Sequence, residues 1–128
     1  MHTMPTVTLS NGLVIGNFSS PHPFNFTTGE ILAACSPERA LMGALEAVEI
    51  EATNGRWTDI QLSFKLTPAV REALDIAQQS AVDVVLVPLP VLQAVRAEPS
   101  GAARWSKVRC IRCADRITKA IYPDRFCT

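Results

Sequence analysis

Apolar and polar residues alternate along several short segments of the chain, and this period of two is typical of β-strands with one buried face. Asn11-Gly12 and Asn54-Gly55 each separate two such segments. Because these dipeptides accept the positive φ angles of a tight turn, we expect a β-hairpin at each. The expected strands of this kind are residues 6–9, 13–18, 24–26, 48–52, 57–66, 106–114 and 117–122. Residues 84–87 are continuously apolar, which predicts a strand covered on both faces.

Signals for helices lie in the middle of the chain. Ser36-Pro37 and Thr67-Pro68 each combine a capping side chain with proline at the first helical position. After the second of these, apolar residues follow one face of a helix that ends before Asp83. A further short helix is expected over residues 91–97. No repeat or linker divides the chain, so we predict a single α+β domain with two or three helices on a mainly antiparallel sheet.

Length and composition agree with one domain. The chain has 128 residues, of which 48% are hydrophobic, so it can bury a core. No apolar run approaches the roughly 18 residues of a membrane span, and the amino terminus lacks the pattern of a signal peptide. Four cysteines are too few and too unevenly placed for a disulfide scaffold. We therefore expect a cytoplasmic protein with no membrane partner.

Positive charge is concentrated towards the carboxyl terminus. From Gly101 onward, seven basic residues stand against two acidic ones, a net charge of +5. Residues 1–100 carry five basic and ten acidic residues, a net charge of −5. Such polarity can serve to receive an anionic ligand or to pair the acidic and basic faces of two copies. We expect a homo-oligomer, a dimer or a larger closed assembly, formed through the exposed carboxyl-terminal strands.

These strands carry the first set of candidate binding residues. If residues 108–122 are extended throughout, Arg112, Arg116 and Tyr122 share a polar face, with the two arginines about 13 Å apart. Guanidinium groups donate paired hydrogen bonds to phosphate, and aromatic rings stack on bases. The candidates are Arg109, Arg112, Arg116 and Arg125 for phosphates and Tyr122 for stacking. The alternative is that the arginines form ion pairs with nearby aspartates or with acids of a neighbouring subunit.

A second set follows the first expected hairpin. Prolines on both sides of His22 restrict the backbone, so this segment loses little entropy when it becomes ordered. Hydrogen-bonding side chains alternate there with phenylalanines. The candidate ligand-binding residues are Asn17, Phe18, Ser19, Ser20, His22 and Asn25. The alternative for each polar residue is that it satisfies the backbone of its own turn.

Metal chemistry has little support in the sequence. Cys110 and Cys113 have the spacing of a zinc-binding pair, but no second Cys-x-x-Cys accompanies them. Residues three apart in a strand point to opposite faces, so we expect the two thiols to diverge and to bind no zinc. The remaining candidate ligands are Cys35, Cys127, His2 and His22.

Catalytic signals are equally weak. Neither a Gly-x-Ser-x-Gly motif nor a glycine-rich phosphate loop occurs. A hydrolase or transferase acting on a nucleotide would need His22 to meet Asp115 or Asp124 in one cleft. We expect no catalytic residue and no cofactor.

Two segments resemble those of small phage and prophage proteins: residues 11–24, NGLVIGNFSSPHPF, and residues 114–127, ADRITKAIYPDRFC. The family they are most similar to is the anti-Thoeris sponges. The resemblance implies an oligomer with pockets at its subunit interfaces that binds cyclic ADP-ribose isomers, and in some members cyclic oligonucleotides, without cleaving them.

We therefore expect a phage anti-defence protein that sequesters a nucleotide-derived immune signal in the cytoplasm of its bacterial host. Its partners would be this small ligand and other copies of the chain, and we expect no long nucleic acid. The main alternative is a protein-binding inhibitor that acts through its charged faces. The nucleotide-acting enzyme is the other alternative.

Overall fold

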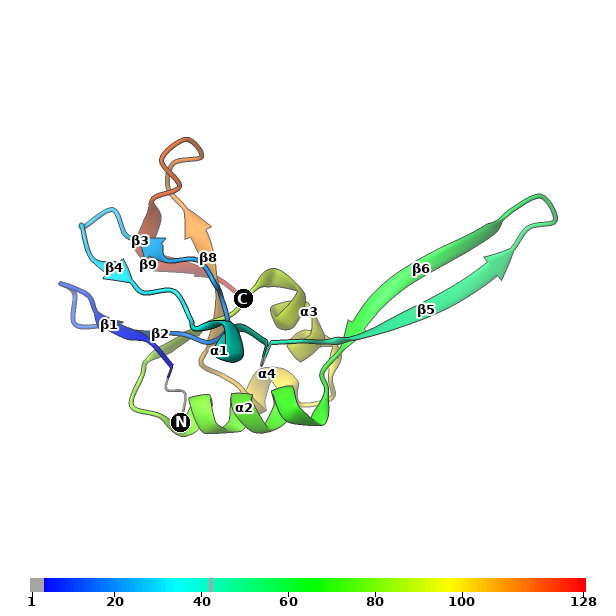
Figure 1. Cartoon of the computed structure of the whole chain (residues 1–128), viewed down its shortest axis with the longest axis horizontal. Helices are drawn as coiled ribbons and strands as arrows, with labels where there is room; N and C mark the ends of the chain where they lie inside the picture. The colour runs from blue at the N-terminus through cyan, green and yellow to red at the C-terminus, as the bar shows by residue number, and fades with distance from the viewer. Residues whose placement is uncertain (1–3, 42) are drawn as a thin grey trace.

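A five-stranded sheet forms the centre of the computed structural model, which describes residues 4–41 and 43–128. The strand order is β1-β2-β7-β8-β9 (Figure 1). Their bounds are β1 Thr6–Thr8, β2 Val14–Asn17, β7 Val84–Leu86, β8 Val108–Cys113 and β9 Ile121–Cys127. The two outer pairs, β1–β2 and β8–β9, are antiparallel, whereas β7 pairs in parallel with both β2 and β8. The predicted α+β class is confirmed, with a sheet that is mixed at its centre.

Two separate hairpins accompany this sheet. Their strands are β3 Phe24–Asn25 with β4 Ile31–Leu32, and β5 Glu46–Thr53 with β6 Thr58–Lys65. The expected turns at Gly12 and Gly55 are confirmed, and both glycines adopt the positive φ that these turns require, +90° and +94°. Strand β4 is an addition to the prediction, because two residues are too short to show a period of two.

The described residues contain four helices, against two or three expected. They are α1 Pro37–Leu41, α2 Pro68–Gln79, α3 Leu89–Ala97 and α4 Gly101–Arg104. Both predicted caps are present, since Ser36 Oγ accepts from Arg39 N at 3.3 Å and Thr67 Oγ1 accepts from Val70 N at 3.2 Å. The extra helix, α4, is a single turn between the helix expected over residues 91–97 and the strand expected over residues 106–114. In the part of the chain described, no helix is both long and apolar enough to cross a membrane.

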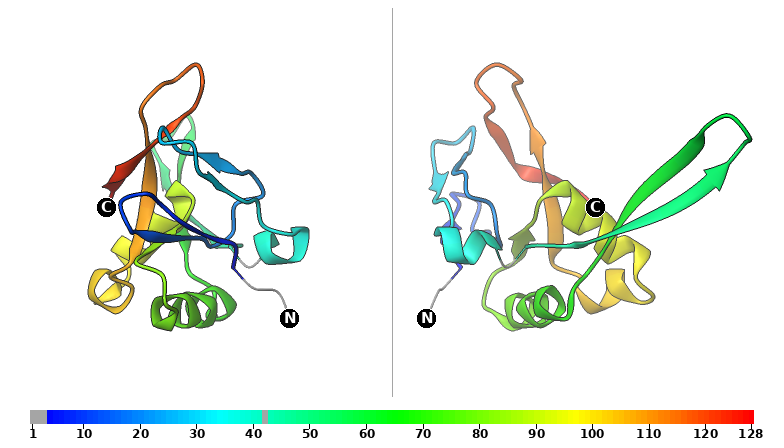
Figure 2. Two further views of the ribbon diagram at one scale, coloured as in Figure 1. Left: turned by 90° about the vertical axis from the view of Figure 1, so that its left-hand side faces the viewer. Right: turned by 45° about the vertical axis from the view of Figure 1, so that its right-hand side comes forward.

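Side chains cover the central sheet on both faces. On one face α2 and α3 bury apolar residues against β7, and Val85 and Trp105 belong to this core (Figure 2). On the other face Leu86 packs with Phe26 and Leu32 of the β3–β4 region. Adjacent residues of β7 therefore enter different cores, as the continuously apolar pattern of this strand predicted.

The β5–β6 hairpin leaves this body as a long arm (Figures 1 and 2). Its strands pair with each other over eight positions, from Glu46↔Lys65 to Thr53↔Thr58. Apart from that pairing, their main contact is that of β6 with α3 near the base. We call residues 46–65 the arm.

The last strand differs from its prediction. Residues 117–122 were expected to be extended, but residues 114–120 form the turn between β8 and β9, and β9 begins at Ile121. Asp115 Oδ1 accepts from Ile117 N at 2.7 Å, and Ala114 N donates to Ala120 O at 2.8 Å to close the loop. Pro123 does not end β9, since an edge strand tolerates a missing donor.

Candidate functional site

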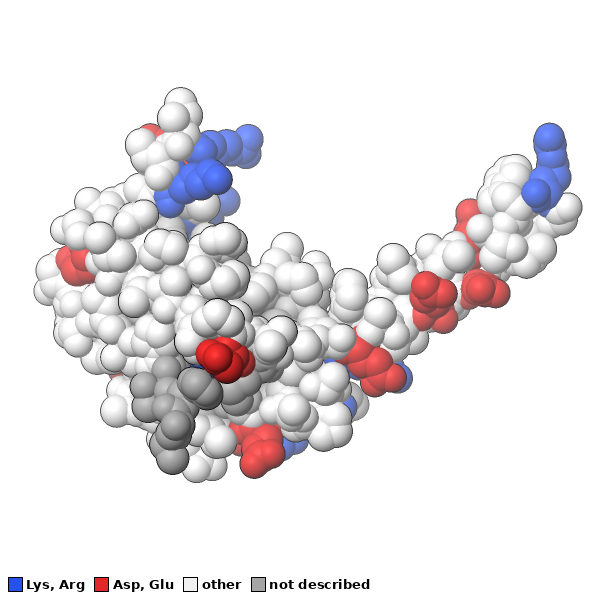
Figure 3. Space-filling view, in the orientation of Figure 1, with Lys and Arg blue, Asp and Glu red and all other residues white. Residues whose placement is uncertain are grey.

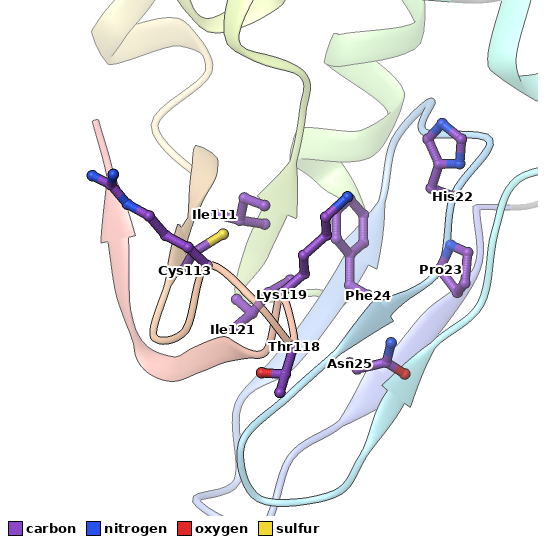
Figure 4. A pocket seen from close by; sticks show the side chains of 10 residues that line it. His22, Pro23, Phe24, Asn25, Ile111, Cys113, Thr118, Lys119 and Ile121 are labelled. Atoms are coloured by element: carbon purple, nitrogen blue, oxygen red, sulfur yellow. The ribbon is translucent and has the colours of Figure 1, made fainter.

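A cavity of about 590 Å³ opens between β3 and the β8–β9 hairpin (Figure 4). Its lining residues come from the proline-rich segment before β3, from β3 itself, and from β8, the following turn and the start of β9. They are His22, Pro23, Phe24, Asn25, Ile111, Cys113, Arg116, Thr118, Lys119 and Ile121. The two segments that line it are thus those in which the sequence placed candidate binding residues.

Backbone contacts hold the two sides of the cavity together. Phe26 forms a parallel bridge with Ile121, and Thr27 N donates to Ile121 O at 3.0 Å. The β3–β4 hairpin is thereby attached to the first residue of β9. Ile121 is buried with Phe26 in the second core, so the floor of the cavity rests on packed side chains.

Two cations line this cavity, Arg116 and Lys119, both from the β8–β9 turn. Among the described residues the ion pairs are Arg71–Glu98 and Arg104–Asp75, so neither cation is paired within the chain. Lys119 adopts φ +59°, a left-handed conformation that is uncommon for a side-chain-bearing residue. Figure 4 shows its side chain extending from the turn towards the strand that carries Phe24. The turn therefore presents unpaired positive charge beside an aromatic ring.

A second cavity of about 410 Å³ adjoins the first. Its lining is mainly apolar and consists of Ser20, Phe24, Pro88, Leu89, Cys110, Ile111 and Cys127. Phe24 and Ile111 line both cavities. A basic compartment and an apolar one thus lie on either side of these two residues.

The remaining candidate arginines are placed differently. Arg109 Nη1 donates to Ser106 O at 2.6 Å and Val108 O at 2.8 Å, so its guanidinium is engaged by backbone. Arg125 lies over the ring of Tyr122, 5.0 Å from its centroid, and neither residue lines the basic cavity. Arg112 is exposed and also lies outside this lining.

The predicted shared polar face of Arg112, Arg116 and Tyr122 is therefore wrong. It required an extended chain from residue 108 to 122, whereas the register shifts between Ile111 and Cys113 and the chain then turns. Among the described residues no ion pair joins these arginines to Asp115 or Asp124, and Asp115 accepts hydrogen bonds from its own turn.

Three residues of the amino-terminal set, Asn17, Phe18 and Ser19, are buried. The prediction that they contact a ligand is therefore corrected, and their role is structural. Asn17 is 0% exposed, and its amide donates to Ser20 O at 3.1 Å and Ala33 O at 3.0 Å. Phe18 lies in the main core, with the guanidinium of Arg39 5.3 Å from its ring centroid. Ser19 is buried as well, and its hydroxyl has no hydrogen-bond partner among the residues that the structure describes. The alternation of polar residues and phenylalanines suggested a polar binding loop. In the structure, residues 17–19 instead form the end of β2 and the buried residues that follow it.

The other members of this set reach a cavity. His22 and Asn25 are exposed and line the basic one, and Ser20 lines the apolar one. The Ser20 hydroxyl also accepts from His22 N at 3.2 Å, so it orders the segment as well. Neither Asp115 nor Asp124 joins His22 in the cavity lining, so the pair required by the enzyme alternative does not meet there.

Cys110 and Cys113, which were expected to point to opposite faces of a strand, differ in burial. Cys110 is buried with its thiol 3.3 Å from Val87 O, whereas Cys113 is exposed. Among the residues that the structure describes, no group of three or more potential metal ligands is close enough to hold an ion. His2 lies outside the described residues.

Seven of the ten lining residues were not in the predicted set, and Lys119 and Phe24 are among them. Lys119 lies in the turn at residues 114–120, where the sequence predicted a strand over residues 117–122. The phenylalanines of the amino-terminal segment were expected only to alternate with its hydrogen-bonding side chains. The signal that could have found Lys119 is the Asp115-x-x-Thr118 pattern, whose side chains favour a turn.

Comparison of this chain with family models, curated proteins and solved structures finds no match.

Proposed function

We propose that the protein binds a nucleotide-derived immune signal and sequesters it without cleaving it. The observation that supports this most is the basic cavity, in which the unpaired cations Arg116 and Lys119 lie with Phe24. Phosphate groups match such cations, and a base matches an aromatic wall.

The dimensions of the site agree with a small ligand. A volume of about 590 Å³ is in the range of cavities that hold drug-sized molecules. The adjoining apolar cavity extends the site past Phe24 and Ile111, so one ligand can place charge near the turn and a ring near the apolar side. A molecule with phosphates at one end and a base at the other has this distribution.

The resemblance of residues 11–24 and 114–127 to anti-Thoeris sponges narrows the proposed ligand class. Both segments contribute to the cavity lining, the first through Pro23 and Phe24 and the second through Arg116 and Lys119. We therefore propose cyclic ADP-ribose isomers as the first ligands to test and cyclic oligonucleotides as the second. A phage anti-defence role follows from such sequestration.

The test is calorimetric titration of the protein with these nucleotides, followed by mass spectrometry of the recovered ligand. Replacing Arg116 or Lys119 with alanine is expected to weaken binding roughly ten- to a hundredfold, since a charge-assisted hydrogen bond contributes about 1.5–3 kcal/mol. Arg116→Lys should restore only part of the affinity, because a point charge lacks the planar fork of guanidinium. Arg125→Ala is the matched control, since it removes an exposed arginine of the same hairpin that lies outside the cavity lining.

Equal loss in the Arg125 and Arg116 variants would indicate general attraction by the basic surface. Unchanged affinity in both cavity variants would place the ligand elsewhere. A chemically altered ligand would replace sequestration with catalysis.

A further inference from the structure

The arm exposes apolar side chains for which the chain itself provides no cover. Ile50, Trp57, Ile60, Leu62 and Phe64 are each between 43% and 59% exposed. Isolated apolar residues are normal on a surface, but adjacent ones along a projecting hairpin are typical of an interface. A two-stranded hairpin also has little stability by itself in water.

The strand register shows which arm residues share a face. Glu49 is paired with Leu62, and Glu51 is paired with Ile60. Directly paired residues point to the same side of a hairpin, so apolar side chains of β6 lie beside carboxylates of β5. We call this surface the arm face: Glu49, Glu51, Ile60, Leu62 and Phe64. Residues 46–65 as a whole carry four acidic and two basic residues, a net charge of −2.

The turn between β8 and β9 has the complementary character. Residues 112–119, which we call the basic tip, carry three basic residues and one acidic residue, a net charge of +2. The acid, Asp115, accepts hydrogen bonds from the turn backbone. Ile117 at this turn is 92% exposed. The basic tip therefore places the apolar Ile117 among cations that form no ion pair in the described chain. The arm face places a row of apolar side chains from β6 beside carboxylates that form none either.

These two surfaces point away from the same body and lie apart in space (Figures 1 and 3). In Figure 3 the basic side chains gather over the β8–β9 turn, and acidic ones lie along the arm. One chain therefore does not bring its own arm face against its own basic tip.

The total exposed area agrees with an uncovered interface. The chain exposes 7934 Å², whereas a compact monomer of 13.9 kDa is expected to expose about 6,700 Å². The excess of about 1,200 Å² exceeds the roughly 800 Å² that each partner contributes to a standard interface. Docking of the arm against a second copy can therefore bury enough area for a stable dimer.

We propose that the arm face of one copy docks on the basic tip of a second copy, and that a two-fold axis makes this contact twice. The charges set the orientation, and Ile117 contacts the apolar row of β6. This goes beyond the predicted self-association, which was assigned to the carboxyl-terminal strands alone. It does not depend on the proposed nucleotide ligand.

The first test is light scattering of the ligand-free protein at about 50 µM in ordinary salt. The wild type is expected to have twice the 13.9 kDa of one chain. Leu62→Arg is expected to be monomeric because it replaces an apolar contact of the arm face with a cation that faces the cations of the basic tip. Ile76→Arg is the matched control, since Ile76 on α2 is about as exposed as Leu62. A monomeric wild type, or a Leu62→Arg variant that keeps the mass of a dimer, would overturn the proposal. Circular dichroism establishes that the variants are folded.

A charge exchange tests the partner surface. Glu49→Arg with Glu51→Arg, and separately Arg112→Glu, should each raise the dimer dissociation constant at least tenfold. Combining them should recover most of the loss, because the opposed charges are exchanged. Additive losses would place the partner of the arm on another surface. Arg112 lies outside the nucleotide cavity, so this result and ligand binding can fail separately.

Cross-linking locates the contact directly. A carbodiimide joins a carboxylate to an amine without a spacer, and Lys119 is the amine of the tip. Mixing ¹⁵N-labelled and unlabelled protein should give a labelled–unlabelled peptide pair that joins Glu49 or Glu51 to Lys119. Links found only within one copy would contradict the proposal.

Discussion

Cys110 is a residue whose environment sets a pH response. Its side chain is buried, and Cys127 is its partner across the β8–β9 pair. Two effects raise the pKa of Cys110 from 9.0 to about 11. The larger is burial, and the smaller is repulsion from the Cys127 thiolate. The folded state therefore holds its proton in a range where the unfolded chain releases it.

This shift predicts a loss of stability at alkaline pH. Between pH 9 and 11 the unfolded state binds fewer protons at Cys110 than the folded state does. The stabilisation that the protonated thiol gives the folded state is therefore fully present below pH 9 and is lost as the pH rises through about 11. Its size is on the order of 2 kcal/mol, since one pKa unit corresponds to about 1.4 kcal/mol. Urea unfolding of wild type and Cys110→Ala should show converging stabilities from pH 8 to 11. Parallel curves would mean that the thiol titrates normally.

At the scale of elements, the stability of α2 depends on its N-cap residue, Thr67. Thr67 Oγ1 accepts from Val70 N, and the helix then buries Val70, Ala73, Leu74 and Ala77. An amphipathic helix of this kind is positioned by its packing, while the cap satisfies a backbone donor that the helix cannot.

Removal of the cap should have a measurable cost. We expect Thr67→Ala to lower the free energy of unfolding by about 1 kcal/mol, since an unsatisfied N-terminal donor costs about that much. Thr67→Ser, which keeps the hydroxyl, should change it by a few tenths of a kcal/mol. Denaturant unfolding followed by circular dichroism provides the comparison, and equal losses in both variants would indicate that the methyl group matters instead.

The elements that sequence predicted are those with local causes. Asn11-Gly12, Asn54-Gly55 and Thr67-Pro68 fix their turns or helix start through the conformations of a few residues. The alternation at Ile117 was misleading, because this isoleucine is exposed at a turn that Asp115 stabilises. Burial of an apolar residue depends on distant partners, so a period of two alone did not separate strand from turn.

The candidate site was predicted in outline only. The two contributing segments were identified, and His22, Asn25 and Arg116 line the basic cavity. The sequence alone does not distinguish Asn17 from these lining residues. Its amide donates to carbonyls such as that of Ala33, which only the fold brings near. Side-chain type shows hydrogen-bonding capacity, and the three-dimensional neighbours decide whether it is already used.

At the scale of the whole molecule, body and arm are separable. Neither hydrophobic core contains a residue between 46 and 65. The arm therefore adds surface rather than core, and its removal should leave the body folded.

A shortened chain tests this separation. Ala47 and Phe64 are paired near the base, so residues 48–63 can be replaced with an Asn-Gly turn. We expect its free energy of unfolding to be within about 1 kcal/mol of that of the monomeric Leu62→Arg protein, since changes that touch no core contact are small. Loss of cooperative unfolding would show that the arm is needed to fold the body.

The two tryptophans of the chain sit at opposite extremes of solvent access. Trp57, near the end of the arm, is 58% exposed, whereas Trp105 is 1% exposed and donates to Asp75 Oδ1 at 2.9 Å. Iodide or acrylamide should therefore quench Trp57 emission strongly and Trp105 emission weakly. Trp57→Phe and Trp105→Phe divide the fluorescence into one reporter of the arm and one of the core. Unfolding of the arm and of the body can thus be followed separately in the same cuvette with no attached dye.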